Sequence, residues 1–126
     1  MTKPPDPPLK VLVVDYHHDS VNLTARILSG VGYVIRTAEC CADALDIARA
    51  ERIDVLISDI GLPDGDGCGL LATINAIYPV RAVAFTGYAT ASEWERYERA
   101  GFSALLLKPS EIDRIVDAVA SANWLR

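Results

Sequence analysis

Short runs of apolar, often β-branched residues alternate along the chain with longer segments in which apolar residues recur every three or four positions. The short runs predict strands and the recurring pattern predicts amphipathic helices. Five strands are expected, at residues 10–15, 33–37, 54–59, 81–86 and 104–108. Five helices are expected between and after them, at residues 19–29, 42–50, 67–77, 91–100 and 110–122.

Residues with strong local preferences mark several of these boundaries. Asp19 and Ser110 are predicted to cap the first and last helices, because a short polar side chain can accept hydrogen bonds from the first free N–H groups. Asp66 is expected to begin the third helix, after a turn. Gly30, Gly32 and Gly101 lie where helices should stop.

The alternation of strands and helices predicts the fold class. Strands that are apolar on both faces are typical of a parallel sheet covered by helices on each side. We therefore expect an α/β fold, a doubly wound five-stranded parallel sheet with strand order 2-1-3-4-5, which right-handed crossovers favour. The first nine residues carry four prolines and predict an extended arm or linker, which leaves residues 10–126 as one domain.

Composition narrows the functional classes. The 126 residues include 12 basic and 17 acidic side chains, a net charge of −5, and no basic cluster, so direct nucleic-acid binding is not expected. No apolar segment approaches the roughly 20 residues of a membrane span, and no hydrophobic signal region begins the chain, which predicts a cytoplasmic protein without membrane contact. Cys40, Cys41 and Cys68 lack the spacing of a zinc site and are expected to be reduced thiols.

Four of the predicted strands end on a polar or charged residue: Asp15, Asp59, Thr86 and Lys108. Because ligands of such sheets bind beyond the carboxyl ends of the strands, these residues should converge. An unpaired carboxylate is costly to bury, so Asp59 is expected to face water, a charged group or a reaction partner. Taken singly, each residue has a plainer interpretation, as a turn residue, a solvated lysine or a β-branched strand residue.

These residues appear in order with the segment "SDIGLPDGDG", the pair Thr86-Gly87 and the dipeptide Lys108-Pro109. Together they resemble the receiver domain of bacterial two-component response regulators, which has a flavodoxin-like fold. The resemblance covers residues 10–122.

The resemblance implies a role for each matching residue. Asp59 would accept a phosphoryl group from a sensor histidine kinase or a histidine phosphotransfer protein, and its carboxylate would be exposed because it must react. Thr86 and Lys108 would contact the transferred oxygens. A Mg²⁺ ion would be held by Asp15, Asp59 and the main-chain carbonyl of Gly61. The protein would then be a conformational switch that acts on a downstream protein target. It would not be a conventional enzyme, since it would catalyse at most its own phosphotransfer and dephosphorylation.

Two positions depart from the family pattern. Tyr16 stands where a second acidic residue usually follows Asp15, and an uncharged phenol is a poor ligand for a hard cation, so weak Mg²⁺ binding is expected. Leu105 stands where an aromatic residue or histidine often precedes the lysine by three positions. His17 and His18 are interpreted as loop residues, because adjacent histidines point apart and no third ligand is evident.

These departures keep a second function open, a pseudo-receiver that binds a protein partner with little or no Mg²⁺-dependent phosphorylation. A flavin-binding electron carrier is disfavoured, since "DYHHDS" supplies an acid where a phosphate-binding loop needs donors. The sequence ends shortly after the last helix, which suits either a stand-alone receiver or a domain of a larger protein.

Overall fold

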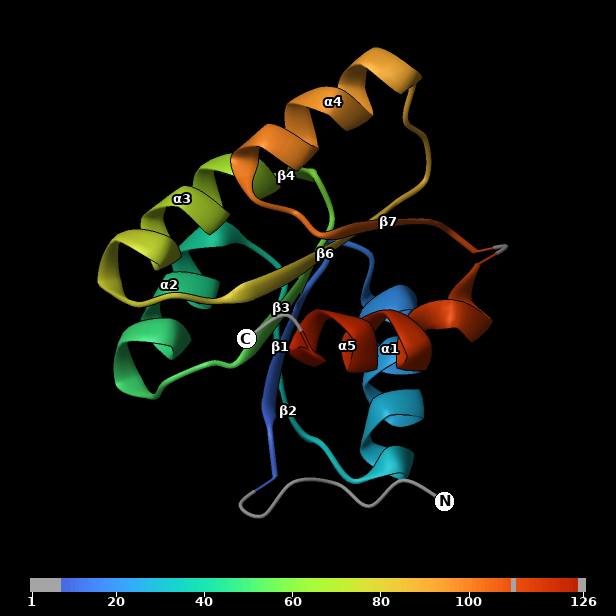
Figure 1. The fold of residues 1–126 in the computed structure, drawn as a ribbon. Coiled ribbons are helices and arrows are strands. Elements are labelled where there is room, and N and C mark those ends of the chain that lie inside the picture. Colours follow the sequence, from blue (N-terminus) through green and yellow to red (C-terminus); the bar gives the residue numbers. More distant parts are fainter. Residues whose placement is uncertain (1–7, 110, 125–126) are drawn as a thin grey trace.

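A parallel sheet forms the centre of the molecule. The computed structural model describes residues 8–109 and 111–124. Within these residues, one sheet has five parallel strands in the order β2-β1-β3-β6-β7 (Figure 1). The strands are β1 (Lys10–Val14), β2 (Val34–Ala38), β3 (Val55–Ser58), β6 (Arg81–Thr86) and β7 (Ala104–Leu107). Counted among these five alone, the order is the predicted 2-1-3-4-5.

Helices cover both faces of this sheet (Figure 1). One face carries α2 (Cys41–Ala50), α3 (Gly67–Ile77) and α4 (Ala91–Ala100). The other carries α1 (His18–Val31) and α5 (Ile115–Trp124), the latter preceded by the short 3₁₀ helix η1 (Ile112–Arg114). The bounds of α3 and α4 are those predicted from the sequence.

The alternating side chains of β1 show why its sequence is apolar throughout. Leu12 and Val14 are buried in the cluster that includes Ala44 of α2. Val11 and Val13 are buried on the opposite face with Leu28 of α1. A strand that is covered on both sides has no polar face, which is the pattern that predicted a parallel sheet.

The helix ends agree in part with the prediction. Gly32 and Gly101 end α1 and α4 with φ angles of 108° and 117°, in the left-handed region that favours glycine. The prediction that Gly30 stops a helix is wrong, because this residue lies within α1. The predicted Asp19 cap is wrong, because α1 begins one residue earlier, with His17 at the N-cap position, and Asp19 lies in the first turn. Ser110 lies outside the described residues, and the following helical segment begins as η1 at Ile112.

A short antiparallel hairpin follows β3, and the sequence did not predict it. Its strands are β4 (Gly61–Leu62) and β5 (Gly65–Asp66). Asp66 caps α3 as expected, since its side chain accepts a hydrogen bond from Gly69 N at 2.8 Å. Asp64, in the turn, also has a capping role: its carboxylate accepts from the N–H groups of Cys41 and Ala42 at 2.8 and 3.0 Å. The hairpin thereby ties the end of β3 to the starts of two helices.

Most of the predicted arm, residues 1–7, lies outside the described residues. Leu9 is buried, and its carbonyl accepts a hydrogen bond from Val34 N at 3.0 Å. No helix among the described residues is both long and apolar enough to cross a membrane. The three cysteines are free thiols. Burial, together with the nearby Asp64 charge, raises the pKa of Cys41 to about 11, which keeps this thiol protonated and weakly reactive at neutral pH.

Two glycines should respond oppositely to replacement by alanine. Gly101→Ala should lower the free energy of unfolding by about 1–2 kcal/mol, because alanine is strained at positive φ and its Cβ would lie 3.3 Å from Leu71. Gly30→Ala is the control: this residue lies within α1 with open space around it, so stability should rise by up to about 0.5 kcal/mol. Urea denaturation of both variants checks the prediction, and a destabilised Gly30→Ala would contradict it.

Candidate functional site

Backbone hydrogen bonds hold three of the candidate residues one position beyond the ends of their strands, and the fourth, Thr86, is the last residue of β6. Asp15 N donates to Ala38 O at 3.1 Å, and Asp59 N donates to Val14 O at 2.9 Å. Lys108 N donates to Thr86 O at 2.8 Å. The parallel register thus continues past each strand and brings Asp15, Asp59, Thr86 and Lys108 to one edge of the sheet, where the sequence analysis expected them.

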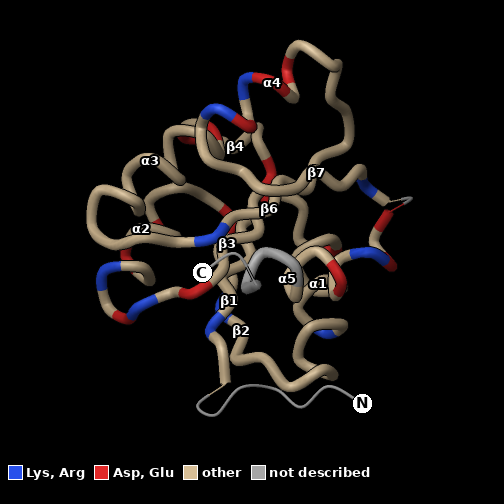
Figure 2. The backbone as a smooth tube through the Cα atoms, viewed as in Figure 1, with Lys and Arg blue, Asp and Glu red and all other residues tan. Residues whose placement is uncertain are grey.

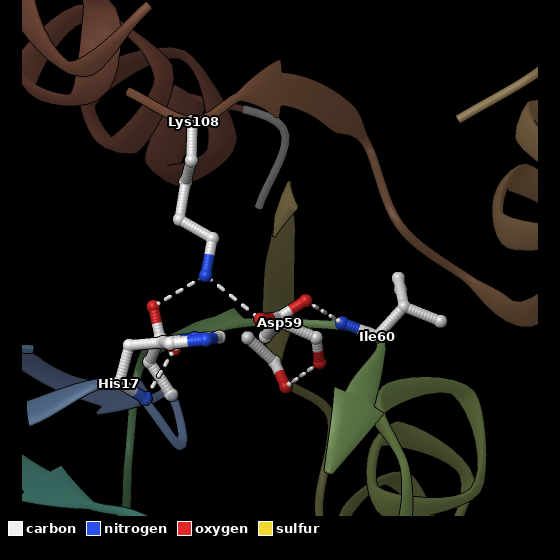
Figure 3. A network of polar contacts seen from close by, with 6 residues as sticks. His17, Asp59, Ile60 and Lys108 are labelled. Carbon is white, nitrogen blue, oxygen red and sulfur yellow. Dashed lines mark hydrogen bonds and ion pairs between the residues drawn. The ribbon is translucent and has the colours of Figure 1, made fainter. Parts of the chain in front are cut away.

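The Lys108 ammonium bridges the two carboxylates of this edge. Its Nζ donates to Asp15 Oδ2 and to Asp59 Oδ2, both at 2.7 Å (Figure 3). The side chains of Asp15, Asp59 and Lys108 are 4%, 10% and 12% exposed. The expectation that Asp59 is exposed is therefore wrong: the carboxylate is buried, and the ammonium supplies the partner that a buried charge requires.

Further contacts fix the orientation of Asp59. Its Oδ1 accepts a hydrogen bond from Ile60 N at 2.7 Å, and its main-chain carbonyl accepts one from Ser58 Oγ at 2.7 Å. Gly67, the first residue of α3, approaches so closely that a Cβ there would lie 2.5 Å from Asp59 O. The sequence analysis did not assign a role to Gly67; the available signal was a glycine directly after the predicted helix cap.

A hollow of about 430 Å³ opens above these groups. It is lined by His17, Ser20, Asp59, Gly61, Thr86, Gly87, Lys108 and Pro109. Thr86 is buried at the end of β6, and Gly61 is exposed at the start of the hairpin. The hollow therefore gives small molecules and partner side chains access to Asp59 from the direction of Thr86 and Gly61.

Charge pairing outweighs burial at this site. Burial raises the pKa of Asp15, but hydrogen bonds from Lys108, from the His17 N–H and from Ser20 lower it, and the net pKa lies below the usual value. Burial likewise lowers the pKa of Lys108, but its hydrogen bonds to Asp15 and Asp59 raise the net pKa above the usual value. At neutral pH, Asp15 is therefore ionised and Lys108 is protonated.

The structure also brings His17 to the site, although the sequence analysis interpreted it as a loop residue. Asp15 Oδ1 accepts a hydrogen bond from His17 N at 2.9 Å and lies 3.3 Å from His17 Nδ1. Ligand atoms of Asp15, His17 and Asp59 all lie within 4.8 Å of one another. His18 is the first residue of α1 rather than a loop residue. It turns away, as expected of an adjacent residue, and its Nδ1 lies 2.9 Å from Glu39 Oε2. Tyr16 is 59% exposed.

Comparison with known proteins identifies this arrangement. The family model described as response regulator receiver domain matches residues 11–120. The chain belongs to this family. The receiver is 32% identical over 113 residues to the sensor histidine kinase RcsC of Salmonella typhi, covering 89% of this chain and 12% of RcsC. It is 26% identical over 117 residues to the polar-differentiation response regulator DivK of Brucella anthropi, covering 90% of this chain and 95% of DivK. The receiver thus spans only a small part of RcsC.

Solved structures agree with the family assignment. A CheY-like receiver domain protein from Methanospirillum hungatei superimposes with a TM-score of 0.85 at 24% identity, covering 93% of this chain and 94% of that one. The receiver domain of beryllofluoride-activated NtrC4 gives a TM-score of 0.85 at 25% identity, covering 92% and 97%. The described fold is therefore the CheY-type, flavodoxin-like arrangement of five parallel strands with flanking helices.

The donor groups of this receiver fit Mg²⁺ poorly. Mg²⁺ prefers anionic and carbonyl oxygens, and the edge offers the carboxylates of Asp15 and Asp59, already bridged by Lys108, and the carbonyl of Gly61. The residue in the position of the second acid, Tyr16, is largely exposed, and the side chain that forms a close group with the two carboxylates is instead the imidazole of His17. We therefore assign no step of the chemistry to Mg²⁺.

Removing the bridging ammonium should destabilise the receiver in a pH-dependent way. Lys108→Met should lower the free energy of unfolding by about 3 kcal/mol at pH 7, because it leaves two buried carboxylates without a counter-charge. In the parent, the lowered pKa of Asp15 contributes stability above about pH 4, the usual range of an aspartate, and this is lost as pH falls through the folded value. The difference in unfolding free energy between the parent and Lys108→Met should therefore become smaller in acid.

The raised pKa of Lys108 affects the stability of the receiver at alkaline pH. Its contribution is fully present below about pH 10.4, the usual lysine value, and is lost as pH rises through the folded value. Lys10→Met is the matched control, because Lys10 pairs with Glu51 at 3.3 Å on the surface and should matter little. Urea denaturation of the parent and both variants from about pH 2 to about pH 11 covers both windows. Equal losses of unfolding free energy in the two variants would count against the bridge.

Proposed function

We propose that this receiver is the phosphoacceptor of a two-component phosphorelay, with Asp59 as the residue that is phosphorylated. The observation that carries the proposal is the carboxylate of Asp59 at the floor of an open hollow, 2.7 Å from the Lys108 ammonium. Thr86 lines the same hollow. A nucleophile, a fixed cation and a hydroxyl donor thus surround the space in which a transferred phosphoryl group would lie.

The chemistry follows from this geometry. A carboxylate oxygen of Asp59 forms a bond to the phosphorus of a phosphohistidine while the P–N bond breaks, and the imidazole leaves with the electron pair and takes up a proton. The Ile60 N–H and the Lys108 ammonium each hold one oxygen of the carboxylate, which orients it for in-line attack. As charge moves onto the phosphoryl oxygens, Lys108 is already placed to stabilise it.

Phosphorylation would also supply the signal. The added charge of about −1.5 to −2 draws Lys108 and the Thr86 hydroxyl toward the phosphoryl oxygens. Thr86 ends β6, so its movement is passed to residues 87–90 and the start of α4. Leu105 pairs with Ala84 of β6 and is partly buried against the core cluster that includes Ala84, so no aromatic ring at that position takes part in the change.

The partners of this switch would be proteins. A sensor histidine kinase or a histidine phosphotransfer protein would supply the phosphoryl group, and the similarity to part of the kinase RcsC supports this class of partner. Lys and Arg residues are interspersed with Asp and Glu along the backbone, rather than gathered into a basic face (Figure 2). This distribution favours a downstream protein target over nucleic acid, and a cytoplasmic location suits such partners.

A pseudo-receiver is the second candidate, and the exposed Tyr16 favours it. Without the second carboxylate, the site has one negative charge fewer to hold Mg²⁺. In this case, the fold and the Lys108 bridge would be kept for contact with a protein partner alone. The two candidates differ in whether Asp59 can be phosphorylated at all.

Incubation with phosphoramidate and excess Mg²⁺, followed by intact mass measurement, separates the two candidates. The parent should gain one phosphoryl group, and Asp59→Asn should gain none, because an amide is not a nucleophile of this kind. Asp46→Asn, which alters an exposed carboxylate on α2, is the control and should be modified like the parent. A modified Asp59→Asn protein would sink the assignment of Asp59, and an unmodified parent would favour the pseudo-receiver.

Thr86 tests the switch separately from the transfer. Thr86→Val keeps the β-branched shape that β6 buries but removes the hydroxyl, so phosphorylation should no longer change the backbone after the strand. Thr86→Ser keeps the hydroxyl and should preserve the change. The backbone change is measured as the difference in hydrogen exchange of residues 87–100 with and without phosphoramidate. An equal response in the valine variant would show that the signal bypasses this hydroxyl.

A further inference from the structure

We propose that His17 is a metal ligand in this receiver, binding a divalent cation together with Asp15 and Asp59. The imidazole takes over the function of the second acidic residue that Tyr16 replaces. The receiver should consequently prefer a cation that accepts nitrogen ligands, such as Co²⁺, to Mg²⁺. The inference deepens the proposed function, because the ion would lie beside the phosphoacceptor, but it concerns the unphosphorylated protein and can be tested without any phosphodonor.

The three side chains are close enough to share one ion. Ligand atoms of Asp15, His17 and Asp59 lie within 4.8 Å of one another. Bonds of about 2.0–2.2 Å to a cation place two donor atoms about 3–4.4 Å apart, so only a small adjustment is needed. The ring of His17 extends toward Asp59, and its side chain is 72% exposed, which leaves it free to make that adjustment (Figure 3).

Lys108 leaves donor capacity on the His17 side of the carboxylates. The ammonium contacts Oδ2 of Asp15 and Oδ2 of Asp59. Asp15 Oδ1 instead faces His17, at 2.9 Å from its N–H and 3.3 Å from Nδ1. Each carboxylate oxygen can accept more than one interaction. Two carboxylates and one ammonium also leave a net charge of −1, which attracts a further cation.

The chemistry of the donors indicates which cation this is. Carboxylate and carbonyl oxygens suit Mg²⁺, whereas imidazole is a good ligand for the later first-row metals. Tyr16, in the place of the second acid, makes an edge-to-face contact with the His17 ring, with centroids 6.0 Å apart. The residue that removes one oxygen ligand thus packs against the nitrogen ligand that we propose in its place.

His18 provides a matched control. Its side chain is 70% exposed, close to the 72% of His17, and it follows directly in the chain. Its Nδ1 pairs with Glu39, away from Asp59. Replacing either histidine by alanine removes an imidazole at the start of α1, but only His17→Ala removes a proposed ligand.

Isothermal titration of the unphosphorylated chain with Co²⁺ and with Mg²⁺ tests the proposal. The parent should bind Co²⁺ more tightly than Mg²⁺, and His17→Ala should lower the Co²⁺ affinity about tenfold or more while changing the Mg²⁺ affinity less than about twofold. His18→Ala should leave both affinities unchanged. His17→Asp, which restores an anionic oxygen, should raise the Mg²⁺ affinity and so reduce the ratio of the Co²⁺ affinity to the Mg²⁺ affinity.

Three results would overturn the proposal. Unchanged Co²⁺ binding in His17→Ala would show that the carboxylates hold the ion alone. An equal loss in His18→Ala would place the ion at His18 and Glu39, and no Co²⁺ binding by the parent would show that His17 serves only as a partner of Asp15. These titrations contain no phosphodonor. If Asp59 failed to be phosphorylated in the separate experiment, the proposed function would be overturned, but the metal-binding result would still stand.

Discussion

The site depends on one ammonium group between two buried carboxylates. Lys108 Nζ lies 2.7 Å from Asp15 and 2.7 Å from Asp59, and the two acids come from different strands. Without it, burial of both acids at one edge of a sheet would be strongly unfavourable. The same contact orients Asp59, the proposed phosphoacceptor, and keeps a positive charge beside it. Stability and the proposed chemistry therefore rest on the same three side chains.

Parallel strand geometry explains how the chain delivers these groups. The central strands β1, β3 and β6 are buried along most of their length, and Asp15, Asp59 and Lys108 each follow directly after the carboxyl end of a strand. There, one further backbone hydrogen bond at Asp15, Asp59 and Lys108 extends the register and fixes the position of each side chain. A rigid sheet thus supports the three charges, whereas the loop with His17 and the segment after Thr86 can respond to what binds in the hollow.

The sequence predicted those features of the fold and site that follow from the apolar periodicity and from the residues at the strand ends. The strand order, the two helical layers and the convergence of Asp59 with Lys108 all follow from apolar strands in a parallel sheet. It missed the hairpin after β3, because two-residue strands leave no periodic pattern. It also misjudged the exposure of Asp59, because the partner that permits its burial lies 49 residues away. His17 was undervalued for a similar reason: its proximity to Asp59 arises only when β1 and β3 pair.

The central claim is that the buried, lysine-bound carboxylate of Asp59 is the reactive group of this receiver. Location of the phosphoryl group on the chain tests it most directly. The phosphorylated protein is treated with borohydride, which reduces an acyl phosphate to the alcohol, and its peptides are sequenced by mass spectrometry. The account predicts homoserine at position 59 and aspartate at every other acidic position. Homoserine at another position, or unmodified peptides throughout at saturating phosphoramidate and divalent cation, would contradict it.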